Sequence, residues 1–250
     1  MKKLLLILLL AMTASVQAQD ADALFESGKE HYKADAFQEA IADWKAILDK
    51  GQHSKAVYFN LGNAYYKLGE VAPSIYYYEK ALQLDPTDKE VKNNLVFAQN
   101  LRIDVIEPLP KTVFTRVYDN TIGSLDSNLW AWLSVGLLMA GVLSFLGYYF
   151  SATTVRKRIL FVGSLVLFGL VLFSFTAAYL SAADEKNERS AIVFSDTMDV
   201  REAPKNSGTV AFQLHAGTKL EIIDQDGDWL RIKLSNGKDG WVSASALKEL

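Results

Sequence analysis

The chain lacks the residues that most catalytic and metal sites need. Its 250 residues contain no cysteine, which excludes disulfides, thiolate zinc sites and thiol nucleophiles together. Its three histidines, His31, His53 and His215, do not pair at metal-ligand spacing, and no phosphate-binding loop, nucleophile elbow or glycine-rich dinucleotide turn is present. The net charge of -3 provides no basic footprint for nucleic acid. We therefore expect no enzyme activity, no cofactor, no metal and no nucleic-acid partner.

The first residues have the order of an export signal. Lys2 and Lys3 precede an apolar run over residues 4–10, and the small residues Val16 and Ala18 follow. This order predicts a signal peptide over residues 1–18 that is cut after Ala18. An uncleaved anchoring helix is the alternative.

The segment that follows contains an internal repeat of 34 residues. Gly28 and Gly62 are separated by this distance, and so are Ile41 and Ile75. The second copy also has apolar and aromatic residues at helical spacing, and Pro86 closes it. An amphipathic stretch over residues 91–98 then predicts a helix that caps the array.

These positions resemble the tetratricopeptide repeat family, whose units are pairs of helices. The resemblance covers residues 21–86 and implies an all-α array over residues 21–104 that binds protein partners on its concave face. By position, six residues would form this face: Phe25, Lys29, Tyr32, Phe59, Asn63 and Tyr66. Packing roles for several of these aromatics are the alternative. The pattern also predicts that only one of Tyr76, Tyr77 and Tyr78 lies in the core, with the other two on the helix surface.

Two apolar segments predict transmembrane helices over residues 129–150 and 159–180, because each is about as long as the roughly 20 residues that cross a bilayer. Arg156, Lys157 and Arg158 crowd the loop over residues 151–158 between them, so the positive-inside rule makes this loop cytoplasmic. We therefore expect a two-pass protein of the inner membrane with its N- and C-terminal domains in the periplasm. The spans contain no ionisable residue that would form an ion pathway.

Two further features of the membrane region leave alternatives open. Gly136, Ala140 and Ser144 form a stripe of small residues that would pack against the second span or against another protein. Residues 105–128 form a linker in which apolar residues from Val113 to Leu125 recur on one helical face. This helix would lie in the membrane interface or pack on the repeats.

Residues 190–250 change to short alternating strands separated by turn residues such as Asn236-Gly237. Together with Gly240-Trp241-Val242, this order resembles the bacterial SH3-like domains and implies an all-β SH3-like barrel. Relatives of that kind bind cell-wall peptides or other proteins. Trp229 and Trp241 are the candidate contacts, and a structural role for both is the alternative.

The predicted fold is thus multidomain: an all-α tetratricopeptide array, two transmembrane α-helices and an SH3-like barrel. With the segment from Tyr58 to Gly69, this order resembles the BatE proteins of the Bacteroidetes aerotolerance operons. The resemblance implies partners among von Willebrand factor A-domain membrane proteins and a MoxR-type ATPase, and a scaffold role in oxygen or envelope stress tolerance. A cell-wall sensor that binds peptidoglycan is the competing hypothesis.

Overall fold

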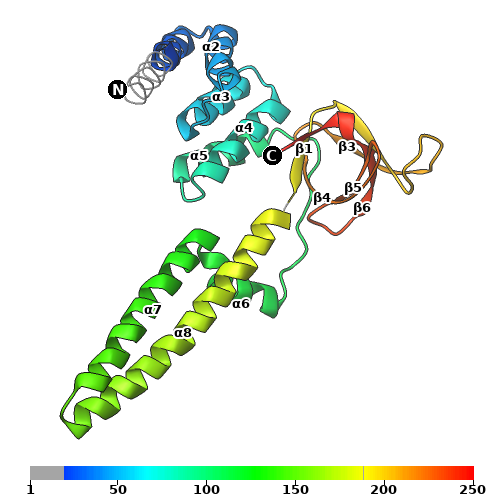
Figure 1. Ribbon diagram of the computed structural model, residues 1–250. Coiled ribbons are helices and arrows are strands. Elements are labelled where there is room, and N and C mark those ends of the chain that lie inside the picture. Colours follow the sequence, from blue (N-terminus) through cyan, green and yellow to red (C-terminus); the bar gives the residue numbers. More distant parts are fainter. Residues whose placement is uncertain (1–19, 188) are drawn as a thin grey trace, which may run out of the picture. The chain divides into compact units, whose positions relative to one another are not determined.

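The computed structural model describes residues 20–187 and 189–250 (Figure 1). The predicted signal peptide lies outside the described residues. The remainder divides into two compact units. The first combines the chain up to Pro108 with Arg189–Leu250, and the second begins at Leu109 and ends before the C-terminal domain.

The first unit begins with the repeat array, which is entirely helical. Residues 20–33 are helical, and four helices follow them: α2 (Phe37–Asp49), α3 (Lys55–Lys67), α4 (Val71–Leu84) and α5 (Lys89–Gln99). Consecutive helices pack on one another in chain order, as Figure 1 shows. The 34-residue period of the sequence therefore corresponds to a stack of helix pairs with α5 as the last helix.

The repeated glycines let each helix pair approach closely. A Cβ atom at Gly28 would lie 2.4 Å from the indole nitrogen of Trp44, and one at Gly62 would lie 2.6 Å from the ring of Tyr78. Trp44 and Tyr78 are themselves one repeat apart, and both are almost fully buried. The same contact between a glycine and a large ring thus closes both repeats, and the predicted role of the glycines is confirmed.

The prediction for the three consecutive tyrosines is wrong. Tyr76, Tyr77 and Tyr78 are all buried, with relative exposures of 8%, 6% and 1%. Tyr77 stacks on Tyr65 at a centroid distance of 5.6 Å. Tyr76 packs edge-on against Phe194 of the C-terminal domain. Helix α4 is covered on more than one side, so a pattern with one apolar face underestimates its burial.

The C-terminal part of the first unit, which we call the β-domain (residues 190–250), is an antiparallel sheet with an SH3-like fold. Its strands are β1 (Ser190–Val193), β2 (Thr197–Arg201), β3 (Val210–His215), β4 (Lys219–Asp226), β5 (Trp229–Lys233), β6 (Asp239–Ser243) and β7 (Leu247–Glu249). They pair in the order β3-β2-β6-β5-β4-β1-β7. Alternate residues such as Val200, Ile232 and Val242 are fully buried, which gives the sheet one core face.

The second unit is a helical hairpin preceded by a short helix. It consists of α6 (Val113–Thr121), a single 3₁₀ turn (Ile122–Ser124), α7 (Ser127–Phe150) and α8 (Thr154–Asn187). Ser127–Phe150 and Thr154–Asp184 are long and apolar enough to cross a membrane, with mean hydropathies of 2.0 and 2.5. Most of their large apolar side chains are exposed, which would be costly in water but not in lipid.

The contact between α7 and α8 uses only part of the predicted small-residue stripe. The hydroxyl of Ser144 donates to the carbonyl of Leu160 at 3.0 Å, so Ser144 faces α8. Gly136 and Ala140 are exposed instead, and Ser134 and Gly141 are the small residues buried in α7. The assignment of Gly136 and Ala140 to the face between the spans is therefore wrong. Residues spaced strictly four apart move gradually around the helix and leave the face between the spans. Residues 134 and 141 are seven apart and residues 141 and 144 are three apart, which matches the average spacing of 3.5 residues in a contact between two helices.

Candidate partner-binding surfaces

A cavity of about 170 Å³ opens on the repeat array and gathers residues from four helices. Tyr32 comes from the first helix, Asn63 and Tyr66 from α3, and Asn94 and Phe97 from α5. Lys67 and Tyr78 complete its wall. We call this cavity the groove. Aromatic rings beside amide side chains suit an extended peptide, which presents side chains and backbone amides together.

Asn63 is held in place by two hydrogen bonds to one of its atoms. Its Oδ1 accepts from the Tyr78 hydroxyl at 2.6 Å and from the Asn94 amide nitrogen at 2.9 Å. Within the described residues, the amide nitrogen of Asn63 donates to no protein group. Asn63 thus keeps a fixed, half-buried donor at the groove, where it can meet a backbone carbonyl of a ligand.

The structure brings together three of the six residues predicted for the concave face and places the other three elsewhere. Tyr32, Asn63 and Tyr66 lie together in the groove. Phe25 lines another cavity, of about 510 Å³, and Lys29 pairs with Glu26 on the surface above the Phe25 ring. Phe59 packs against Tyr78 at a ring centroid distance of 6.1 Å.

Sequence reasoning missed the contribution of α5 to the groove. Phe97 lies one repeat after Asn63, which itself lies one repeat after Lys29. Continuing the 34-residue spacing into the capping helix would have found Phe97. The side chain of Phe97 is 58% exposed, which is unusual for an aromatic residue in a packed array and fits a contact surface.

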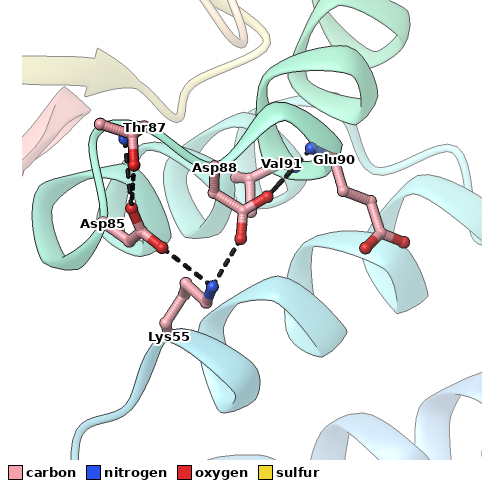
Figure 2. Close-up of polar contacts among 6 residues, drawn as sticks. All are labelled: Lys55, Asp85, Thr87, Asp88, Glu90 and Val91. Atoms are coloured by element: carbon pink, nitrogen blue, oxygen red, sulfur yellow. Dashed lines mark hydrogen bonds and ion pairs between the residues drawn. The ribbon is translucent and has the colours of Figure 1, made fainter.

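A polar cluster fixes the start of α5 (Figure 2). Asp88 caps this helix, because its Oδ1 accepts from the backbone nitrogens of Glu90 and Val91 at 2.9 and 3.1 Å. Lys55, at the start of α3, donates to both Asp88 and Asp85. These bonds lower the pKa of both carboxyls below the ordinary aspartate value, the largest cause being the hydrogen bond from Lys55. The cluster ties α5 to α3, the two helices that carry Asn94 and Asn63.

The candidate tryptophans of the β-domain lie on its outer face. Trp229 and Trp241 alternate along β5 and β6 with the buried Leu230 and Val242, so their side chains point away from the core. Trp241 is paired with Arg231 on one neighbouring strand and with Arg201 on the other. Both tryptophans are half-buried on this surface.

The β-domain packs directly on the array, which the sequence did not reveal. Asp104, just after α5, accepts three hydrogen bonds from the β-domain. They come from the backbone nitrogen of His215 at 2.6 Å, from its Nδ1 at 2.8 Å and from the Thr218 hydroxyl at 2.7 Å. We call these three residues the clasp. Burial alone would raise the pKa of the Asp104 carboxyl, but the bonds from His215 and Thr218 outweigh it and hold the pKa below its ordinary value.

Further contacts surround the clasp. Lys219 forms an ion pair with Glu79 of α4 at 2.9 Å. The ammonium of Lys248 lies 4.3 Å from the ring centroid of Tyr76, and burial, then the nearby Lys45 and Lys80, lowers its pKa. Ile192 and Phe194 join the apolar cluster of the array. Array and β-domain therefore form one body joined by polar and apolar contacts.

Comparison with known proteins assigns two parts of the chain. The tetratricopeptide repeat family matches residues 56–88, which span α3 and α4. The bacterial SH3 domain family matches residues 196–248, from before β2 into β7.

Two curated proteins of Bacillus subtilis (strain 168) are similar to this chain. One is named "Putative N-acetylmuramoyl-L-alanine amidase YrvJ" and is 31% identical over 77 residues, which cover 31% of this chain and 14% of that protein. The other is the "Cell wall-binding protein YwsB", 38% identical over 55 residues, which cover 22% of this chain and 31% of that protein. The similarity therefore spans less than a third of either relative.

Proposed function

We propose that the chain is a non-enzymatic, membrane-anchored adaptor that docks a segment of a partner protein in the groove. The observation that carries this proposal is the groove itself, where the fixed amide of Asn63 lies beside the rings of Tyr32, Tyr66 and Phe97. The amide suits a peptide carbonyl, and the rings suit apolar side chains on either side of it. The tetratricopeptide match supports a protein as the ligand.

We further propose that α7 and α8 anchor this adaptor in the inner membrane with both outer domains in the periplasm. The basic residues Arg156, Lys157 and Arg158 at the connection between the two helices support a cytoplasmic loop. The resemblance to the BatE proteins supports a complex in aerotolerance or envelope stress. Its candidate partners are von Willebrand factor A-domain membrane proteins and a MoxR-type ATPase.

Crosslinking in the native host, followed by capture of the full chain, tests the groove. Tyr66→Ala with Phe97→Ala removes two rings of the groove and leaves the buried core intact, unlike Phe59→Ala, which would take packing from Tyr78. Two lost contacts of about 1 kcal/mol or more each would reduce capture of neighbouring membrane proteins by about tenfold or more. The control is Gln83→Ala with Leu84→Ala, two exposed residues of α4 outside the groove. Undiminished capture by the groove variant at equal abundance would exclude the groove as the docking site.

A second candidate function is recognition of the cell wall by the β-domain. Two observations favour it: the relatives carry names from cell-wall biology, and Trp229 and Trp241 lie on the outer face beside Arg201 and Arg231. Aromatic rings suit sugar faces, and arginines suit the carboxylates of stem peptides.

Sedimentation of the detergent-solubilised full chain with isolated peptidoglycan tests this second function. Wild type should sediment, and Trp241→Ala should remain in the supernatant. The control is Ile223→Ala, an exposed apolar residue of β4. If wild type does not sediment, or if both variants sediment equally, peptidoglycan binding through this face is ruled out.

A further inference from the structure

Helix α6 has an apolar side that nothing in its own unit covers. Val113, Phe114 and Val117 are 72%, 88% and 57% exposed, and no residue of α6 is buried. At about 100° per residue these three side chains fall within one arc of the helix, while Thr115 and Asp119 occupy the opposite side. A one-sided helix of this kind normally buries its apolar face.

Hydrogen bonds fix α6 and the 3₁₀ turn after it to one end of the hairpin. The indole nitrogen of Trp130, in the first turn of α7, donates to the carbonyl of Ile122 at 2.8 Å. The hydroxyl of Tyr118 donates to the carboxylate of Asp184, near the C-terminal end of α8. Ser181 donates to the carbonyl of Leu125 at 3.5 Å. The helix is therefore held where α7 begins and α8 ends.

At this end of the hairpin the apolar span of α7 begins, at Ser127, and the apolar span of α8 ends, at Asp184. The 24 residues of α7 extend for about 36 Å, slightly more than the roughly 30 Å of a bilayer's hydrocarbon core. Leu129 and Trp132, in the first turns of α7, are 52% and 73% exposed. The apolar side of α6 thus lies beside the same end of the lipid-facing surface, and in Figure 1 α6 runs across the axes of α7 and α8.

We propose that α6 is an interfacial helix that inserts Val113, Phe114 and Val117 into the outer leaflet, with a lipid surface as its binding partner. The polar side, with Thr115 and Asp119, then faces the headgroups and water. The ion pair of Lys111 with Asp119, at 2.6 Å, and the Thr112 cap at the nitrogen of Thr115 stabilise the helix without using its apolar side. The proposal rests on the proposed membrane anchoring by α7 and α8.

Single-cysteine labelling tests this proposal directly, because the natural chain has no cysteine. Phe114→Cys, Thr115→Cys and Leu138→Cys would each carry an environment-sensitive fluorophore. Leu138 is an exposed residue in the middle of α7. The full chain is reconstituted at high lipid excess into vesicles of phosphatidylethanolamine and phosphatidylglycerol. Quenching by aqueous iodide is then compared with quenching by lipids that carry a nitroxide just below the headgroup.

The fluorophore at Phe114→Cys should emit at shorter wavelength than that at Thr115→Cys. It should be quenched several-fold less by iodide and more strongly by the shallow nitroxide. Equal iodide quenching at the two positions would overturn the proposal. Protection of Phe114→Cys from both quenchers would also overturn it, because a protein surface would then cover the helix. Iodide quenching at Leu138→Cys would instead show that the anchoring itself has failed.

Discussion

At the scale of single residues, the clasp and its neighbour Gly217 lie in the contact between the β-domain and the array. Gly217 adopts φ +88°, a conformation that favours glycine. A Cβ atom there would lie 2.9 Å from Val71 Cγ1 and 3.1 Å from Ile75 Cδ1, both on α4. At position 217 the backbone of the β-domain therefore lies closer to α4 than a residue with a side chain would allow.

Gly217→Ala should loosen this contact. Backbone strain of about 1–2 kcal/mol adds to a steric penalty of about 1–3 kcal/mol against α4. Gly69→Ala is the matched control, since Gly69 also has positive φ, +74°, but has open space around its Cβ position. Hydrogen exchange of the full chain should rise in residues 215–219 for Gly217→Ala and stay unchanged there for Gly69→Ala. Equal exchange in the two variants would contradict the proposed close contact.

Asp104→Asn should weaken the same contact in a pH-dependent way. Replacing the carboxylate that accepts three hydrogen bonds should lower the free energy of unfolding by about 1–3 kcal/mol near neutral pH. The contact lowers the pKa of Asp104, so its stabilisation is present above the ordinary aspartate pKa and is lost as pH falls through the lowered value. The difference in unfolding free energy between wild type and variant should therefore shrink between about pH 5 and pH 2. Asp226→Asn, an exposed carboxyl of β4, is the control. A difference that does not change with pH would contradict this role of Asp104.

At the scale of elements, sequence reasoning succeeded where one period governs burial. The glycines of the repeats, the two apolar helices and the alternating strands of the β-domain all follow from local spacing. It failed for Tyr76 because the group that covers this ring, Lys248, comes from the other end of the chain. Sequence reasoning also failed to include α5 in the groove, because the stretch over residues 91–98 was interpreted as a helix that only covers the core of the array. Its contribution to a binding surface, through Asn94 and Phe97, was not considered.

Asp88→Ala should loosen α5 as a unit. The change removes the helix cap and one partner of Lys55. Lys55→Gln is the control, because it removes the ion pairs but keeps the cap, and ion pairs exposed to solvent contribute little to stability. Amide exchange in residues 89–99 of the full chain should rise more for Asp88→Ala than for Lys55→Gln. The reverse order would mean that the ion pair, and not the cap, holds α5.

At the scale of the whole molecule, the array is covered in part by a domain from which residues 109–188 separate it in the chain. Removal of residues 189–250 would expose Tyr76 and Ile75 and would leave Asp104 without its clasp partners His215 and Thr218. Amide exchange in α4 should then accelerate by about tenfold or more, which corresponds to about 1.4 kcal/mol of lost local stability. A full-length chain with Lys219→Ala, which loses only the ion pair with Glu79, is the control. Unchanged exchange in α4 after the truncation would show that the array is stable alone.

The division of the first unit into two segments of the chain, on either side of the hairpin, also orders its synthesis. The array leaves the ribosome first, but its partner strands follow only after both long helices have been made. During that interval the surface of α4 around Tyr76 and Ile75 has no cover and is open to wrong association. The newly made chain therefore passes through a vulnerable stage that ends only when its last sixty or so residues have emerged and joined the array.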